Sequence, residues 1–202
     1  MTVSYERAGE RVHIDSVAEH FTALAQCAAA LESAVPTIRD WARHLAGVYA
    51  LDGRLLACGN GGSAAEAQHL TGELVGRFRH DRRPLSAIAL HADTSAATAI
   101  LNDYGGDEFY ARQVQAHGRA GDVLVTFSTS GCSPNILAAA RAARETAVAV
   151  WALTGPAPNP LASLADSALA VAAPTMATVQ EIHLSMVHGL CLALDEELGV
   201  GR

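Results

Sequence analysis

The sequence predicts a three-layer α/β/α sandwich built on a central parallel sheet of five strands, with a pair of helices before it. Two observations carry this prediction. Short apolar runs alternate with longer stretches of helical periodicity, and such alternation is typical of parallel strands joined by helical crossovers. The length of 202 residues suits one medium domain, in which residues 1–52 supply the helical pair and residues 53–202 the α/β core.

The helical pair precedes the first predicted strand. Residues 16–33 have apolar side chains at helical spacing, with Asp15 or Ser16 available as N-cap. Pro36 suits the first turn of a second helix that runs to about residue 51. Because both helices are amphipathic, they pack either across a subunit interface or on their own subunit, and the sequence leaves both arrangements open.

The core follows as alternating strands and helices. Strands are predicted at residues 55–58, 87–90, 123–127, 148–153 and 169–171. Helices are predicted at residues 64–78, 94–101, 108–116, 134–146, 161–165 and 178–198. Open α/β sheets bind ligands at the carboxyl ends of their strands, so the candidate site lies in the loops that follow the strands.

The composition excludes several classes of function. All fourteen basic residues are arginine, which rules out Schiff-base chemistry, a pyridoxal-phosphate anchor and a Walker A lysine. The net charge of −7 has no basic stripe and gives no reason to expect nucleic acid as a partner. No apolar run reaches the length of a membrane span and no secretory signal is visible, so we expect no membrane association and a cytoplasmic location. The cysteines are far apart and are expected to be reduced, buried residues: Cys27, Cys58, Cys132 and Cys191.

The glycine-rich stretch CGNGGSAAEAQHLTGEL, residues 58–74, joins an anion cradle to a pair of chemically active side chains. Its glycines permit a tight turn, after which Ser63 begins a helix whose first N–H groups attract phosphate. On that helix, His69 and Glu73 are four residues apart and therefore share one face. Such a pair can bind a metal, transfer protons, or do both.

A second polar loop follows the third strand, with the sequence STSGCS at residues 128–133. Phosphate needs several donors that converge on its oxygens. A Ser/Thr/Gly turn at a helix N-terminus supplies them without lysine. The alternative is an ordinary serine-rich turn with Ser133 as N-cap.

The last helix carries polar residues inside an apolar pattern, VQEIHLSMVH at residues 179–188. Gln180 and His188 are eight residues apart, which is about 12 Å along the axis, and they lie within a quarter turn of each other. Both can line one groove, but they reach a shared point only from opposite sides. Glu181 and His183 lie on different faces, and we interpret them as structural or solvent-exposed.

A third polar pair, Asn102-Asp103, stands near the expected edge of the site. Its simpler interpretation is the C-terminal turn of a helix, ahead of Gly105-Gly106. The remaining histidines have no spacing that indicates chemistry and are interpreted as surface or core residues: His13, His20, His44, His80, His91 and His117.

Together these motifs resemble the sugar isomerase (SIS) fold, a flavodoxin-like architecture, of bacterial sedoheptulose 7-phosphate isomerases, also called phosphoheptose isomerases. The resemblance runs from the first helices to the C-terminus. The STSG loop alone specifies only sugar-phosphate-binding SIS domains, and the combination is more specific. The resemblance implies a phosphorylated seven-carbon sugar as substrate, which Gly61, Gly62, Ser63, Ser128, Thr129, Ser130 and Ser133 hold while Asn102 and Asp103 contact its hydroxyls.

The resemblance also implies one divalent metal per subunit, Zn²⁺ by preference, at a cleft between subunits of a homotetramer. Its ligands would be His69, Glu73, Gln180 and His188. For the conversion of sedoheptulose 7-phosphate to D-glycero-D-manno-heptose 7-phosphate, Glu73 is suited to act as the base that forms a cis-enediol and His188 as the acid. Glu73 and Gln180 then also contact the substrate.

Two departures from the family pattern concern specificity. Thr178 stands where many members have arginine, and Cys132 where asparagine is common. Neither removes a proposed catalytic group, and both leave open whether a close relative of the heptulose phosphate is used. The alternatives to the enzyme are a sugar-phosphate sensor and a non-catalytic adaptor that associates with a replication initiator. That adaptor lacks the equivalents of Glu73 and His188, which favours the enzyme.

Overall fold

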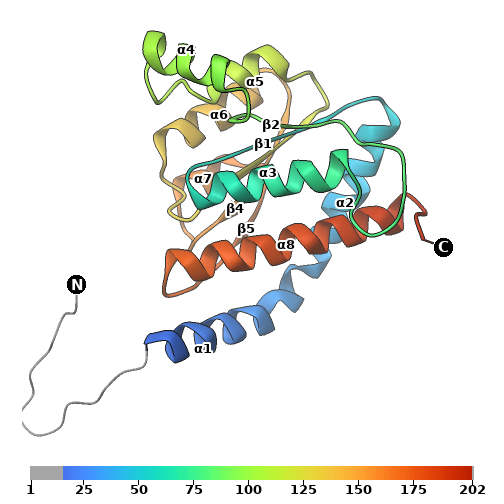
Figure 1. The fold of residues 1–202 in the computed structure, drawn as a ribbon, viewed down its shortest axis with the longest axis vertical. Helices are drawn as coiled ribbons and strands as arrows, with labels where there is room; N and C mark the ends of the chain where they lie inside the picture. The colour runs from blue at the N-terminus through green and yellow to red at the C-terminus, as the bar shows by residue number, and fades with distance from the viewer. Residues whose placement is uncertain (1–15, 202) are drawn as a thin grey trace, which may run out of the picture.

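The computed structural model describes residues 16–201 and contains one parallel sheet of five strands in the order β2-β1-β3-β4-β5 (Figure 1). This confirms the predicted fold class. The strands are β1 (Leu55–Gly59), β2 (Ala87–Ala89), β3 (Val123–Ser128), β4 (Ala149–Thr154) and β5 (Ser167–Ala170). Their boundaries differ from the prediction by one or two residues.

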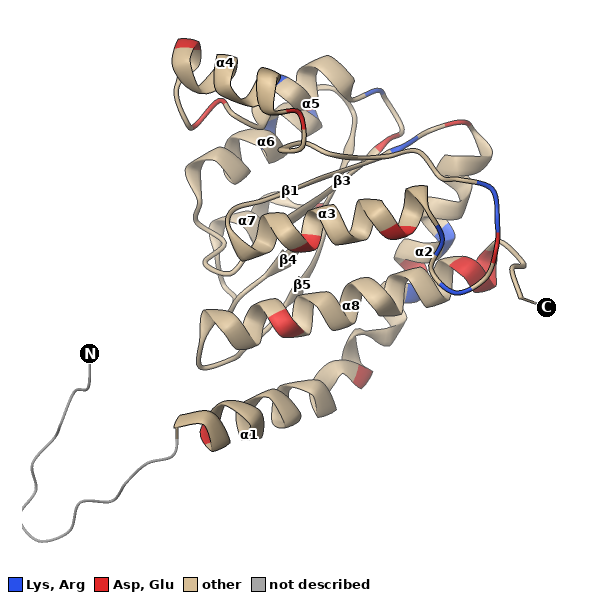
Figure 2. Cartoon of the chain, viewed as in Figure 1, with Lys and Arg blue, Asp and Glu red and all other residues tan. Residues whose placement is uncertain are grey.

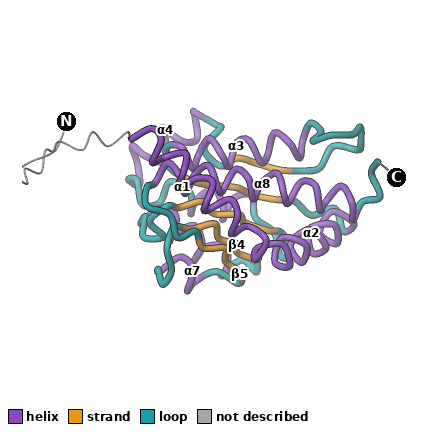
Figure 3. Tube along the Cα trace, turned by 90° about the horizontal axis from the view of Figure 1, so that it is seen from below, coloured by secondary structure: helices purple, strands orange, loops and turns teal. Residues whose placement is uncertain are grey.

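Two helical layers cover the sheet, because alternate residues of each strand face opposite sides. In β1, Leu55 and Ala57 pack toward one layer, whereas Leu56 and Cys58 pack toward the other. The first layer consists of α2 (Val35–Ala50), α3 (Gly62–Val75) and α8 (Met176–Glu197). The second consists of α5 (Ala111–His117), α6 (Pro134–Glu145) and α7 (Pro160–Leu164). Figure 3 shows the strands between α3 and α8 on one side and α7 on the other.

The two N-terminal helices differ in burial. They are α1 (Ser16–Ala29), followed by a 3₁₀ turn η1 (Ala30–Ala34), and α2. In α2, Trp41 is buried and stacks on Trp151 of the sheet with ring centroids 4.8 Å apart. In α1 no residue is buried, and this helix runs along α8 at the outer edge of the molecule (Figure 1). The alternative N-cap, Asp15, lies outside the described residues.

By length and composition alone, the helical region Ser16–Ala50 could cross a membrane. Its second half, α2, packs within the protein, because Ile38, Trp41 and Leu45 belong to the hydrophobic core. The part without buried residues is α1. Whether this region contacts a membrane therefore depends on which surface covers α1.

Helix α4 (Thr94–Tyr104) is longer than predicted. It begins where expected, with the Asp93 carboxylate accepting from the Ala96 N–H at 3.0 Å, but it continues three residues further. Asn102 and Asp103 therefore lie in its last turn, ahead of Gly105, which agrees with their simpler interpretation as a helix C-terminal turn. Only Ala97 of this helix is buried. The helix stands on the far side of α3 from α8 (Figure 1).

The cysteines are only partly as predicted. Among the described residues all four are free, and Cys58 and Cys191 are buried. Cys27 is half-buried, and the prediction of a buried Cys132 is wrong because this residue is exposed. It lies in the loop between β3 and α6, which is not covered by either helical layer at this residue.

Candidate active site

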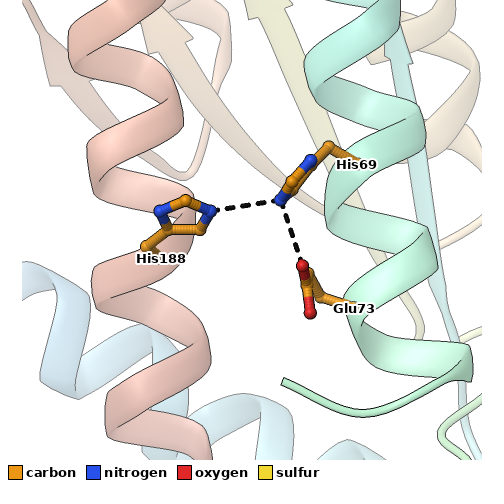
Figure 4. Close-up of side chains that lie close together, drawn as sticks. All are labelled: His69, Glu73 and His188. Carbon is orange, nitrogen blue, oxygen red and sulfur yellow. Dashed lines mark hydrogen bonds and ion pairs between the residues drawn. The ribbon is translucent and has the colours of Figure 1, made fainter. Parts of the chain in front are cut away.

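Three predicted site residues meet between α3 and α8 (Figure 4). The His69 Nε2 atom lies 3.1 Å from Glu73 Oε1 and 3.1 Å from His188 Nε2. His69 and Glu73 come from successive turns of α3, and His188 comes from the middle of α8. Two imidazole nitrogens and one carboxylate oxygen therefore face a common point between the two helices.

The donor atoms of this trio suit a divalent metal. The ligand atoms of His69, Glu73 and His188 all lie within 4.8 Å of one another. Two imidazole nitrogens and one carboxylate oxygen form a donor set typical of catalytic zinc sites, which keep a further position open for substrate or water. The trio lies partly open to solvent, since the His69 side chain is 41% exposed. A small ligand can therefore reach it.

The seam between α3 and α8 carries further polar contacts above the trio. A Cβ atom at Gly62 would lie 2.6 Å from Oε1 of Gln180, so a side chain at residue 62 would displace the Gln180 carboxamide from its present position. Contacts join residue 62 to 180, 66 to 183 and 69 to 188, which shows that the two helices run in the same direction. Gln180 thus lies at the start of α3, two turns of α8 before His188.

The glycine turn before α3 is built as the sequence predicts. Gly61 has φ +56°, a conformation that side chains rarely adopt, and Gly62 is the first helical residue, one earlier than the predicted Ser63. Ser63 is buried. The Asn60 and Asn135 side chains exchange two hydrogen bonds, of 2.9 and 2.8 Å. This pair ties the glycine turn to the first turn of α6, so the two predicted anion loops are joined directly.

The second loop gathers serine hydroxyls at the N-terminus of α6. Ser128 Oγ lies 3.5 Å from Ser130 Oγ and 3.4 Å from Ser133 Oγ, longer than an ordinary hydroxyl hydrogen bond. The Gly131 N–H donates to Ser128 Oγ at 3.1 Å and the Cys132 N–H to Ser130 Oγ at 3.2 Å. Since the oxygens already accept backbone bonds, their O–H groups remain available to donate to an anion.

Strand register brings these loops together. Gly59 at the end of β1 pairs with Phe127, and Ser128 at the end of β3 pairs with Thr154. The glycine turn and the serine loop therefore leave neighbouring strands at the same edge of the sheet. The N-termini of α3 and α6 follow them, and their partial positive charges favour an anion at this edge.

Comparison with known proteins identifies the family. Residues 19–155 match the SIS domain family. Over 186 residues the chain is 59% identical to a phosphoheptose isomerase of Streptomyces coelicolor, an alignment that covers 92% of this chain and 80% of the relative. The chain belongs to the phosphoheptose isomerase family. This confirms the resemblance seen in the motifs and the class of sugar-phosphate isomerase that they predict.

Solved phosphoheptose isomerases have the same fold. The Francisella tularensis structure aligns with a TM-score of 0.85 at 35% identity, covering 92% of this chain and all of the other. The Neisseria gonorrhoeae structure aligns with a TM-score of 0.81 at 42% identity, covering 89% and 97%. The fold class and the family therefore agree, whereas the roles of individual residues stay predictions.

Glu66, inside the glycine-rich stretch of residues 58–74, is a buried carboxylate that the motif analysis did not single out. Glu66 Oε2 is 3.7 Å from His183 Nδ1, and His183 Nε2 lies 3.1 Å from the Thr154 carbonyl oxygen. His183 is fully buried, which confirms its structural interpretation. Burial raises the pKa of Glu66, and the hydrogen bond and charge of His183 offset part of that rise. Glu66 precedes His69 by three residues, so helical spacing alone could have found it.

Two other predicted groups lie apart from the trio within this chain. Asn102 donates to Asp103 at 2.7 Å, and both are exposed on α4. Glu181 forms an ion pair with His20 of α1 at 3.0 Å, which agrees with its structural interpretation.

Asn135 was missed, because its partner Asn60 is 75 residues away and no local spacing links them.

Proposed function

We propose that this protein is the isomerase that converts D-sedoheptulose 7-phosphate to D-glycero-D-manno-heptose 7-phosphate. Family membership supports a sugar-phosphate isomerase. The single observation that carries the assignment of roles is the approach of Glu73 and His188 to His69 across the α3–α8 seam. A carboxylate and an imidazole from two helices can act on one substrate from two sides.

In the proposed mechanism, Glu73 removes the carbon-bound proton next to the carbonyl and gives a cis-enediol. His188 exchanges protons with the two substrate oxygens, and Glu73 then returns a proton to the neighbouring carbon, which yields the aldose. No net oxidation occurs, since one proton leaves carbon and one returns. The Glu73 side chain is 22% exposed, so substrate can reach its oxygens.

We further propose that His69, Glu73 and His188 hold one Zn²⁺ per subunit, with Gln180 as the fourth ligand. When bound there, the ion would polarise the substrate carbonyl. In this chain Gln180 contacts Gly62. Because Gln180 and His188 are about 12 Å apart along α8, a glutamine that joined this cluster would come from a neighbouring subunit.

The phosphate is proposed to bind where the glycine turn and the serine loop meet. Seven residues would contribute donors: Gly61, Gly62, Ser63, Ser128, Thr129, Ser130 and Ser133. The backbone hydrogen bonds that the Ser128 and Ser130 oxygens accept leave their O–H groups able to donate to a ligand. Gln180, beside Gly62, would then contact the sugar chain between phosphate and trio.

A homotetramer is proposed, with residues 1–52 as part of the interface. Val17 and Phe21 of α1 are 61% and 60% exposed, and an apolar helix of this kind is stable in water when another surface covers it. Helix α4 presents Asn102, Asp103 and the half-exposed Tyr104 to solvent. Packing between subunits would bring the Asn102 and Asp103 side chains to the hydroxyls of a sugar bound in another copy.

We also propose that the enzyme acts in the cytoplasm, without a membrane or nucleic acid partner. The net charge of −7 opposes binding to polyanions. The apolar stretch that could suggest a membrane is the one assigned here to the subunit interface. A phosphorylated sugar is a cytoplasmic metabolite by its charge, since a dianion does not cross a lipid bilayer unaided.

The direct test is to incubate the purified protein with sedoheptulose 7-phosphate, with and without added zinc, and to follow the sugar phosphates by NMR. Formation of an aldoheptose 7-phosphate is the expected result, and a dependence on zinc would support the metal site. Binding without conversion would indicate a sensor or another sugar as substrate. Absence of both binding and conversion would favour the non-catalytic adaptor.

A further inference from the structure

One arginine outside the proposed site is buried beside it. The segment between α3 and β2 contains Arg77, Arg79, Arg82 and Arg83, and Figure 2 shows its basic residues near the ends of α3 and α8. Arg77, Arg79 and Arg83 are exposed, but the Arg82 side chain is only 4% exposed. Burial of a guanidinium is unfavourable unless its donors are satisfied, so its partners indicate its purpose.

The first partners are the last carbonyl groups of α3. Arg82 Nη2 donates to the carbonyl oxygen of Glu73 at 2.8 Å, and Nη1 donates to that of Leu74 at 2.9 Å. The helix ends with a bond from the Gly76 N–H to Gly72, so these carbonyls must take donors from outside the helix. The cation also lies at the negative end of the α3 dipole. Arg82 thus holds the turn that carries Glu73.

The third partner is on the other helix. Arg82 Nε donates to Asp195 Oδ1 at 3.1 Å, and the Asp195 side chain is 9% exposed. Asp195 follows His188 by seven residues on α8, so both project from nearly the same face. A single planar group therefore joins the backbone of Glu73 to the helix that carries His188.

We propose that Arg82 is a positioning residue for the isomerisation and fixes Glu73 relative to His188. This inference rests on the roles proposed above for those two residues. Removing Arg82 takes this donor from the Glu73 carbonyl, whereas the Leu74 carbonyl keeps its bond from the Leu85 N–H at 3.0 Å. Lysine keeps the charge but has no planar fork, so it cannot span two carbonyls and a carboxylate.

The test compares steady-state kinetics of wild type, Arg82→Lys, Arg82→Ala and Asp195→Asn on sedoheptulose 7-phosphate. A misplacement of about 1 Å costs about 100-fold in rate, so kcat should fall by about 10- to 100-fold in the three variants. KM should change by less than about threefold, because the phosphate loops are separate from Arg82. Guanidinium ion at millimolar concentration should restore part of the kcat of Arg82→Ala.

Arg39→Ala is the matched control. Arg39 also pairs with a carboxylate of α8, Glu196, at 3.0 Å, but both side chains are more than half exposed. This variant should keep wild-type kinetics. The proposal is overturned if Arg82→Lys and Asp195→Asn keep wild-type kcat, or if the loss in Arg82→Ala is not reversed by guanidinium. Failure of the wild type itself to isomerise the sugar would refute the proposed function instead.

Discussion

Replacement of Glu73 by glutamine tests the proposed base most directly. The carboxamide has nearly the same volume and keeps an oxygen at the position that lies 3.1 Å from His69 Nε2, so the trio should keep its arrangement. What is lost is the basic lone pair and the negative charge. The proposed phosphate donors lie at the start of α3, about 15 Å along the helix from Glu73, and in the loop after β3, so binding of the sugar phosphate should be retained.

The expected loss follows from the role. General-base catalysis contributes about 10²- to 10⁴-fold, which corresponds to about 3 to 5 kcal/mol of activation free energy. We therefore expect kcat of Glu73→Gln to fall at least about 100-fold at saturating zinc. Binding of sedoheptulose 7-phosphate, measured by calorimetry, should change by less than about threefold.

The control makes the same chemical change at an exposed carboxylate, Glu145 at the end of α6. Glu145→Gln should keep wild-type kcat. If Glu73→Gln retained a kcat within about threefold of wild type, the assignment of Glu73 as base would be wrong. If binding and turnover were lost together, the residue would instead be required for the substrate site.

Three further predictions concern the phosphate loop, the buried carboxylate and the interface. Ser130→Ala should raise KM by about tenfold or more with little change in kcat, since a hydrogen bond to a charged group contributes about 1.5–3 kcal/mol, and a changed kcat with constant KM would contradict this. Burial raises the pKa of Glu66 above its usual value, so the folded state binds this proton more tightly and stability is lost as pH rises through that raised pKa. The melting temperature of wild type should therefore fall relative to that of Glu66→Gln as pH rises above the ordinary carboxyl range, and a constant difference would refute the reasoning. Phe21→Asp, at a position 60% exposed, should shift the mass seen by light scattering to smaller species and reduce activity, whereas a monomeric wild type of full activity would exclude the shared site.

The fold was predictable because its signals are local. Each strand is a short apolar run, and each crossover helix has its own periodicity, so the alternation alone indicates a parallel sheet. His69 and Glu73 were predictable for the same reason, since four residues on one helix place them on one face. The length of α4 was not, because Gly105-Gly106 marks a helix end without fixing how far beyond residue 101 the helix runs.

Contacts between distant segments were not predictable from spacing. His188 lies 119 residues from His69, and only the packing of α8 against α3 brings their nitrogens to 3.1 Å. The sequence resemblance grouped them, whereas physical reasoning on the last helix alone placed His188 only in a groove. Arg82 was missed because two of its partners are backbone carbonyl groups, which leave no mark in a side-chain pattern.

The measurement that tests the central claim most directly is the isomerisation of sedoheptulose 7-phosphate in deuterated water, with the product analysed by NMR. Proton transfer through an enediol, with Glu73 as the base, predicts an aldoheptose 7-phosphate that carries solvent deuterium at C2. Solvent deuterium that appeared at C2 at the wild-type rate in Glu73→Gln would contradict the proposed base. Absence of product, with the protein folded and zinc present, would contradict the proposed reaction itself.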